Sequence, residues 1–315
     1  IVRGEDARDD GPSASPIGER GTRDEKDEIS WFKGHTRVFV KIQDGCDNVC
    51  SYCKVRIIRG TSKSRAFSEV LDECRNLIKN GSKEIVLTGI CLGSYGRDIS
   101  DDMNLCRLIR EICEIDGDWR LRLSSIEPKD ITNELIELLR LEKRVCKHLH
   151  IPFQSGDDAI LKRMDRPYAR EYYLNILKKL KQAIPDIAIS TDIMIGFPGE
   201  TEERFQNTLD FIKEACPMRV HIFPFSRRKG TKAYAYKNNI SYSIKKQREH
   251  VLSQISAELY TEFAKKFLHK EVEALLENRE SLSGYLQGYT DRYIKVLIDG
   301  PDSLKGQLIS CKYDN

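Results

Sequence analysis

Short apolar runs alternate with amphipathic segments along residues 34–240. Six runs are β-branched or apolar and bounded by turn residues, which is typical of strands; they span 38–43, 84–88, 120–124, 148–152, 187–195 and 220–225. Between them, apolar residues recur at helical spacing, as at Val70, Leu71, Cys74 and Leu77. Strands that alternate with helices predict an α/β fold with a parallel sheet and right-handed crossovers. Six such units predict an open partial (β/α)6 barrel.

The pattern changes at both ends of this region. Residues 1–33 are polar, charged and rich in Gly, Ser and Pro, so we expect a flexible linker or tail. Residues 241–267 carry an apolar stripe at helical spacing and predict one long connecting helix. Residues 268–315 contain short alternating runs around Gly284, Gly288 and Gly300, which predict a small antiparallel β-domain docked on the barrel.

Three cysteines stand on one short segment directly after the first predicted strand. Cys46, Cys50 and Cys53 have the spacing C-x3-C-x2-C, and three thiolates can hold three irons of a [4Fe–4S] cluster. A fourth iron without a protein ligand would leave an open position for a substrate or cofactor. Because the carboxyl ends of barrel strands carry the functional sites of such folds, we expect this loop to lie at the active edge.

Two other uses of cysteine fit less well. Structural zinc sites usually combine two C-x2-C pairs, and no second pair occurs here. A disulfide framework would need denser cysteines than ten in 315 residues, and those outside the loop are scattered. A structural zinc module therefore remains a distant alternative.

Composition and charge set broad limits. The chain is 40% hydrophobic and 32% charged, as expected for a soluble globular protein, and no apolar run approaches the roughly 20 residues of a membrane helix. Reduced thiols and the absence of a recognisable signal sequence predict a cytoplasmic protein with no membrane partner. A net charge of only +3 makes local basic clusters more informative than the total.

The cysteine loop, with an aromatic residue before its third cysteine, resembles the radical S-adenosylmethionine enzymes. Further runs narrow the resemblance to the methylthiotransferases, namely RGTSKSR, LRLSSIEP, TDIMIGFPGETEERF and FPFSRRKGTKA. EIVLTGICLGSYGRD is most similar to the branch that acts on threonylcarbamoyladenosine beside the tRNA anticodon. The resemblance covers residues 36–315 and implies the same partial barrel, ended by a small RNA-binding β-domain of the TRAM type.

The resemblance implies a set of cofactors. Cys46, Cys50 and Cys53 would bind a [4Fe–4S] cluster, whose open iron would take S-adenosyl-L-methionine. Reductive cleavage of that cofactor would give methionine and a 5′-deoxyadenosyl radical, with an electron donor such as flavodoxin or ferredoxin. Residues expected near S-adenosylmethionine lie in or beyond the strand ends: Tyr52, Thr88, Gly89, Ser125, Gln154, Asp192, Gly196 and Phe197.

Several other polar residues have more than one interpretation. Arg65 and Arg166 match arginine positions of the family, where they would meet a phosphate or the cofactor carboxylate, or else form solvated salt bridges. His148 and His150 share one face of a strand and are interpreted as core histidines rather than ligands.

Basic and aromatic residues indicate RNA contacts. Cations that meet phosphates and rings that stack on bases are the usual components of single-strand RNA binding. The predicted contacts are Arg227, Arg228, Lys229 and Lys232 before the long helix, and Tyr289, Arg292 and Lys295 in the closing domain.

Together these features predict a tRNA methylthiotransferase, an enzyme that adds a methylthio group at C2 of N6-threonylcarbamoyladenosine. The family usually carries a preceding domain with a second [4Fe–4S] cluster that supplies sulfur. Because no cysteine precedes Cys46, we expect that domain to be absent here, so that the chain cleaves S-adenosylmethionine without completing thiolation. The alternatives are modification of isopentenyladenosine in tRNA, modification of a ribosomal protein, and a non-catalytic iron–sulfur protein that binds RNA.

Overall fold

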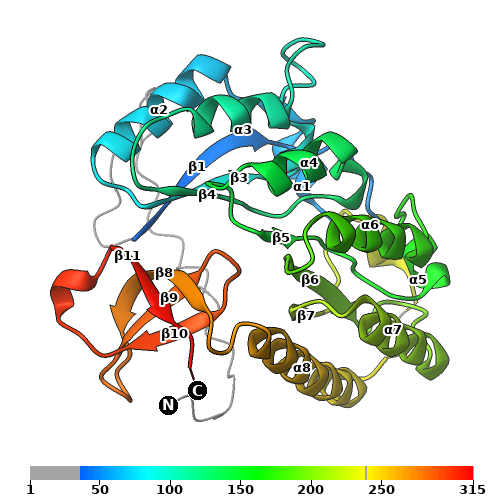
Figure 1. The fold of residues 1–315 in the computed structure, drawn as a ribbon. Coiled ribbons are helices and arrows are strands. Elements are labelled where there is room, and N and C mark those ends of the chain that lie inside the picture. Colours follow the sequence, from blue (N-terminus) through cyan, green and yellow to red (C-terminus); the bar gives the residue numbers. More distant parts are fainter. Residues whose placement is uncertain (1–35, 238–239, 315) are drawn as a thin grey trace.

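A curved, mostly parallel sheet forms the larger part of the molecule (Figure 1). The computed structural model describes residues 36–237 and 240–314, so the predicted tail at 1–33 lies outside the described residues. The strands of this part are β1 (Arg37–Asp44), β2 (Lys63–Ser64), β3 (Glu84–Gly89), β4 (Arg120–Leu123), β5 (His148–His150), β6 (Ala188–Ile195) and β7 (Arg219–Pro224). All six predicted strands are therefore confirmed, whereas the two-residue β2 was not predicted.

The strands are arranged in an open half-barrel. Ladders join β2-β1-β3-β4 and β5-β6-β7, and only the β1–β2 pair is antiparallel. The two ladders meet between β4 and β5, where the Ile126 amide donates to the His150 carbonyl at 2.9 Å and the Cys146 amide donates to the Leu121 carbonyl at 2.8 Å. The predicted partial barrel is thus confirmed.

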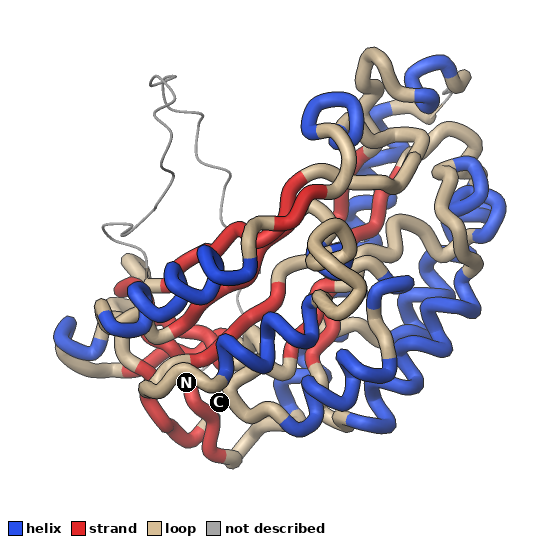
Figure 2. Tube along the Cα trace, turned by 90° about the horizontal axis from the view of Figure 1, so that it is seen from above, coloured by secondary structure: helices blue, strands red, loops and turns tan. Residues whose placement is uncertain are grey.

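Helices cover the outer face of the sheet (Figure 2). They are α2 (Phe67–Lys79), α3 (Leu105–Cys113), α4 (Asn133–Leu141), α5 (Asp158–Arg163), α6 (Arg170–Ala183) and α7 (Glu202–Ala215). The short α1 (Val55–Arg59) has no buried residue and follows the three cysteines in their loop, and short 3₁₀ turns lie at Leu92–Ser94, Pro128–Asp130 and Lys232–Ala235. In α2 the predicted stripe of Val70, Leu71, Cys74 and Leu77 is buried against the sheet. Helix α7 begins after Thr201, whose hydroxyl caps the Arg204 amide.

The long predicted helix is α8 (Tyr242–Lys265), which packs on the barrel beside β7. Its Leu252 belongs to the main core, and the Ser256 hydroxyl accepts a hydrogen bond from the Val220 amide at 2.9 Å. No described helix, α8 included, is long and apolar enough to cross a membrane.

A separate four-stranded antiparallel sheet closes the described chain. Its strands are β8 (Glu271–Arg279), β9 (Leu286–Thr290), β10 (Lys295–Ile298) and β11 (Leu308–Lys312), in the order β10-β9-β8-β11, with a 3₁₀ turn at Asp302–Leu304. This sheet lies beside the start of β1, away from the helices of the barrel (Figure 1). The predicted domain boundaries and the TRAM assignment stay predictions.

A buried ionic cluster joins this sheet to the barrel. Glu84, at the start of β3, accepts hydrogen bonds from Arg120 at 2.6 Å and from Arg122 at 2.7 Å. The same two guanidinium groups donate to backbone carbonyls at the end of β9 and in the turn after it, Arg120 to Tyr289 at 2.8 Å and Arg122 to Asp291 at 2.8 Å. The turn is therefore held against the amino ends of the barrel strands.

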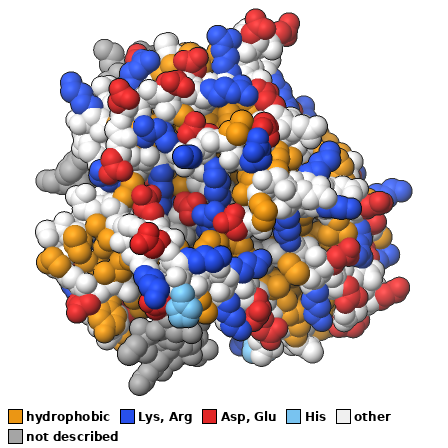
Figure 3. Space-filling model, in the orientation of Figure 1, with side chains coloured by type: hydrophobic (Ala, Val, Ile, Leu, Met, Phe, Trp, Pro, Cys, Tyr) orange, Lys and Arg blue, Asp and Glu red, His pale blue; other side chains and the backbone are white. Residues whose placement is uncertain are grey.

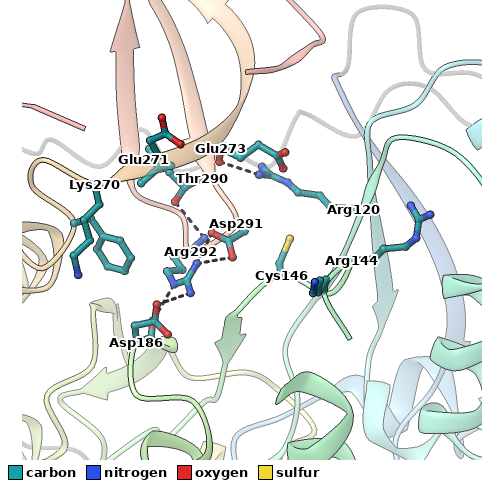
Figure 4. A pocket seen from close by; sticks show the side chains of 13 residues that line it. Arg120, Arg144, Cys146, Asp186, Lys270, Glu271, Glu273, Thr290, Asp291 and Arg292 are labelled. Atoms are coloured by element: carbon teal, nitrogen blue, oxygen red, sulfur yellow. Dashed lines mark hydrogen bonds and ion pairs between the residues drawn. The ribbon is translucent and has the colours of Figure 1, made fainter. Parts of the chain in front are cut away.

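The close-up in Figure 4 shows a pocket next to this cluster, between the barrel and the closing sheet. A cavity of about 390 Å³ is lined by both domains. Across it, the Arg292 guanidinium bonds to the Asp186 carboxylate at 2.6 Å and to Asp291 at 2.8 Å, and Arg120 reaches the Glu273 carbonyl. These contacts fix the position of the closing sheet on the barrel.

We expect Glu84→Gln to destabilise the protein by about 3–5 kcal/mol, because it removes one partner of a fully buried ionic cluster.

Burial alone would raise the pKa of Glu84, but the charges of Arg122 and Arg120 outweigh it and lower the pKa to about 2 from 4.5. A lowered pKa means that this stabilisation is complete above about pH 4.5 and is lost as the pH falls toward 2.

Urea unfolding of wild type and Glu84→Gln between pH 3 and 7 measures both effects. Glu137→Gln is the control, since Glu137 forms an exposed pair with Arg140 and its loss should change stability far less. Equal stability of the two variants at pH 7 would contradict the role assigned to Glu84.

Candidate functional site

The three predicted iron ligands lie on the loop that follows β1, at the carboxyl edge of the barrel. Cys46, Cys50 and Cys53 are partly exposed and form no disulfide. Gly45 shapes the start of this loop with a φ of +69°, and a Cβ atom there would lie 1.9 Å from the Thr61 carbonyl oxygen. Glycine is therefore required for the approach of the two chain segments.

Each of the three sulfur atoms accepts a hydrogen bond from an N–H group. The donors are the Asn48 amide to Cys46 at 3.4 Å, the Val55 amide to Cys53 at 3.4 Å and the Arg166 guanidinium to Cys50 at 3.5 Å. Such bonds stabilise thiolates and tune iron–sulfur clusters. Within the described residues, no three His, Cys, Asp or Glu side chains surround a point where one metal ion would sit. The donor set fits a cluster, in which each thiolate binds a different iron.

Arg166 links this loop to a carboxylate that the sequence analysis missed. The Arg166 side chain is 2% exposed and binds both carboxylate oxygens of Glu127, at 3.2 and 2.6 Å. Tyr168 donates to the same carboxylate at 2.6 Å. The Nε–H group of Arg166 is buried and has no partner among the described atoms. Arg65, by contrast, lies near the protein surface in a salt bridge with Glu73 at 2.6 Å.

Local environments give the loop thiols different pKa values. A hydrogen bond with the Cys91 thiol is the main cause that lowers the pKa of Cys46 from 9.0 to about 6. Burial raises the pKa of Cys50, although the neighbouring Arg166 charge opposes this effect. Burial also raises the pKa of the Tyr52 hydroxyl well above its ordinary value.

The predicted S-adenosylmethionine contacts come from neighbouring strands and from the loops after them. Thr88 and Gly89 end β3, and Ser125 follows β4 and pairs in register with His150. Gln154 pairs with Ile193 of β6, next to Asp192. Because these strands are parallel and adjacent, the structure brings the predicted contacts to the same edge as the cysteine loop.

Gln154 and Asp192 are held by specific contacts. Gln154 has a φ of 70°, rare for a residue with a side chain, and its amide donates to the Asp192 carbonyl at 2.8 Å. The Asp192 carboxylate lies 3.1 Å from Nε2 of His150. Ser190 binds His150 and His148 at 2.9 Å each, so both histidines have protein partners, although Nδ1 of His148 has none among the described atoms.

Tyr52 and Phe197 lie together beside the loop. Their rings form an edge contact with centroids 6.4 Å apart, and Phe197 is fully buried behind Phe225 and Tyr236. Gly196 has a φ of +69°, and its amide donates to the Glu200 carboxylate at 2.6 Å. Phe197 thus lies in the interior behind the Tyr52 ring, whereas Tyr52 is partly exposed and lies nearer the open side of the loop.

The predicted RNA contacts are divided between opposite ends of the barrel. Arg227, Arg228, Lys229 and Lys232 are exposed after β7, beside the cysteine loop, where the Ala233 amide donates to the Ser51 carbonyl at 2.7 Å. Lys232 is paired with Asp165 at 2.9 Å.

The other predicted RNA contacts lie in the closing sheet, at the amino ends of the strands. Arg292 is held by Asp186 and Asp291, and Lys295 binds Glu280 at 2.6 Å. The Arg37 guanidinium lies over the ring of Tyr289, 5.5 Å from its centroid. This placement gives Arg292 a docking role, and the two predicted groups do not form one surface.

Charge alone does not reveal a single nucleic-acid face. In the view of Figure 3, acidic and basic side chains are intermingled over the surface. The position of a basic segment beside the cysteine loop is therefore more informative than the number of cations.

Comparisons with known proteins support this description. The model of the radical SAM superfamily matches residues 40–212. The chain is 39% identical over 289 residues to a threonylcarbamoyladenosine tRNA methylthiotransferase of Bacillus subtilis, covering 90% of this chain and 64% of that protein. It is 40% identical over 275 residues to a tRNA-2-methylthio-N6-dimethylallyladenosine synthase of Alkaliphilus oremlandii, covering 87% and 58%. The chain thus spans about three-fifths of the length of these relatives.

Solved structures agree on the fold. Coproporphyrinogen III oxidase of Escherichia coli, a radical SAM enzyme, superposes with a TM-score of 0.53 at 18% identity, over 74% of this chain and 55% of that one. The methyltransferase TsrM of Kitasatospora setae gives a TM-score of 0.52 at 18% identity, over 62% and 38%. The half-barrel, the cysteine loop at its carboxyl edge and the matching family model show that this chain belongs to the radical SAM superfamily.

Proposed function

We propose that this chain is the radical-generating and RNA-binding part of a tRNA methylthiotransferase that acts on N6-threonylcarbamoyladenosine. The observation that carries the proposal is the loop of Cys46, Cys50 and Cys53, with an N–H donor to each sulfur, at the carboxyl edge of a radical SAM barrel. Similarity to curated tRNA methylthiotransferases over nine-tenths of the chain supports the reaction class.

The identity of the modified nucleoside is the most specific part of this proposal. Relatives named for threonylcarbamoyladenosine and for dimethylallyladenosine have nearly the same identity to this chain, 39% and 40%. Identity therefore does not separate the two substrates, and the choice rests on the run LTGICLGSYG at residues 87–96. Dimethylallyladenosine in tRNA is the second candidate.

The residues fit the two cofactors of the superfamily. When bound, the [4Fe–4S] cluster and S-adenosylmethionine supply a radical that abstracts hydrogen. The three cysteines would hold the cluster, while Arg166 offsets the negative charge of the thiolates through Cys50. Thr88, Gly89, Gln154 and Asp192 would orient the cofactor from the strand ends, and Tyr52 would cover it with Phe197 behind.

RNA would approach the same edge of the barrel. Arg227, Arg228 and Lys229 project beside the cysteine loop, and Tyr234 adds a ring that is 46% exposed. Cations and an accessible ring suit an anticodon loop, whose bases can unstack. The closing sheet would support RNA binding mainly by its docked position, because Arg292 and Lys295 are already paired.

We expect Cys50→Ala to abolish formation of 5′-deoxyadenosine, because it removes one cluster ligand. The full chain is reconstituted anaerobically with iron and sulfide, reduced in the presence of S-adenosylmethionine, and analysed for iron, sulfide and 5′-deoxyadenosine. Cys311→Ala is the matched control, since Cys311 lies on β11 in the closing sheet. Product is expected from wild type and from the control only.

Two outcomes would overturn the assignment. Equal iron and sulfide in Cys50→Ala and wild type would exclude Cys50 as a ligand. A full cluster in wild type without any 5′-deoxyadenosine would favour the non-catalytic iron–sulfur alternative.

Arg228→Ala/Lys229→Ala should weaken tRNA binding and lower its salt dependence. Each phosphate contact adds roughly 0.7–0.9 to the slope of log affinity against log salt, so the slope should fall by roughly 1.4–1.8. Fluorescence anisotropy with an anticodon stem-loop at several salt concentrations measures this change. Lys178→Ala/Lys179→Ala, an equally basic and exposed pair on α6, is the control. The same slope in both double variants would rule out the proposed RNA edge.

The nucleoside is tested by stimulation of cofactor cleavage. A stem-loop that carries N6-threonylcarbamoyladenosine should increase 5′-deoxyadenosine formation more than one that carries isopentenyladenosine, because a correct substrate positions its C2–H at the radical. Unmodified RNA and a ribosomal protein extract are the controls. Greater stimulation by isopentenyladenosine would transfer the proposal to the second nucleoside.

A further inference from the structure

Cys91 lies next to the cysteine loop although it is far from it in sequence. Strands β1 and β3 are parallel neighbours, and their register pairs Gln43 with Gly89. Cys46 follows three residues after Gln43 and Cys91 two residues after Gly89, so both enter loops that leave the same edge side by side.

The buried side chain of Gln43 ties these two loops together. Its Oε1 atom accepts a hydrogen bond from the Cys91 amide at 2.7 Å, and its Nε2 atom donates to the Gly45 carbonyl at 2.9 Å. A second tie joins the hydroxyl groups of Ser62 and Ser94 at 2.7 Å. The backbone positions of Cys46 and Cys91 are thereby fixed relative to each other.

The two thiols are neighbours at this edge. The Cys91 thiol donates a hydrogen bond to the Asp130 carboxylate at 3.8 Å, and its proximity to Cys46 is the main cause that lowers the pKa of Cys46. Cys91 is only 4% exposed, whereas Cys46 is partly accessible to solvent. An oxidant would therefore reach Cys46 first and Cys91 second.

We propose that Cys46 and Cys91 form a reversible disulfide when Cys46 holds no iron. The site takes a low-molecular-weight disulfide, such as glutathione disulfide, as its oxidant. Cys46 sulfur attacks that disulfide and one glutathione leaves; Cys91 sulfur then attacks the mixed disulfide and the second glutathione leaves. Two protein thiols are oxidised, one disulfide is reduced to two glutathione molecules, and these carry away the two protons.

The consequence is protection of a cluster ligand. A disulfide can be reduced again by thiols, whereas sulfinic and sulfonic acids form irreversibly on an unprotected cysteine. The proposal rests on the proposed function only in treating Cys46 as an iron ligand, and its main test, peptide mapping of the iron-free protein, needs neither iron nor S-adenosylmethionine.

Peptide mapping of the full chain tests the proposal. Iron-free protein is treated with glutathione disulfide, blocked with a thiol-alkylating reagent and digested with trypsin. Cleavage at lysine and arginine places Cys46 in peptide 42–54 and Cys91 in peptide 84–97. We expect a cross-link between these peptides that reduction removes, and a fall in free thiols from ten to eight.

Variants assign the two partners. The cross-link should persist in Cys50→Ser/Cys53→Ser and disappear in Cys46→Ser and in Cys91→Ser. Protein with a reconstituted cluster should show the cross-link only after a chelator has removed the iron. Wild-type disulfides confined to the peptide 42–54, or a cross-link that persists in Cys46→Ser, would overturn the proposal. Failure of the radical assay would leave these results unaffected, so the two proposals fail separately.

Discussion

The buried carboxylate of Glu84 is the contact on which the arrangement of the whole chain depends. It lies at the start of β3 and forms ion pairs with two guanidinium groups from β4, Arg120 and Arg122, which are buried with it in the core. Because Arg120 and Arg122 also donate hydrogen bonds to the carbonyls of Tyr289 and Asp291, the same cluster holds the closing sheet on the barrel. Removal of one partner from a buried ionic cluster is strongly destabilising, so Glu84 and both arginines are needed to hold this junction together.

The ionic cluster occupies the amino ends of the strands and leaves the carboxyl ends available for chemistry. At that end the cysteine loop is held by Gln43, Gly45 and the Ser51 contact with Ala233, and ion pairs such as Arg166–Glu127 lie beside it. The contacts that dock the closing sheet and the predicted cofactor contacts therefore lie at opposite ends of the barrel. The carboxyl edge also holds residues in costly geometries, such as Gln154 with its positive φ.

The sequence predicted the periodic elements well, because burial on a sheet or helix imposes a repeating pattern. It missed β2 and α1, since two residues are too few for a period and α1 has no buried residue. The cysteine ligands were recognisable from local spacing, which requires no knowledge of the fold. Glu127 and Cys91 were not, because each is a single residue that reaches the site only through the register of neighbouring strands. Likewise, a pattern of cations could not show that Arg292 faces Asp186 in the interface rather than solvent.

Charge balance around Cys50 explains why Arg166 is buried beside a cluster loop. Three thiolates concentrate negative charge on the loop, and the Glu127 carboxylate adds to it. Arg166 is the cation that contacts both the Cys50 sulfur and Glu127. The carboxylate is nevertheless useful, since it holds the guanidinium plane in a fixed orientation with help from Tyr168. A flexible side chain would lose conformational entropy when it binds the thiolate, and this loss would offset part of the electrostatic attraction. A guanidinium that is already held in place loses less entropy. The unpartnered Nε–H group of Arg166 then remains as a donor in a buried site, where one further acceptor would complete the set of hydrogen bonds.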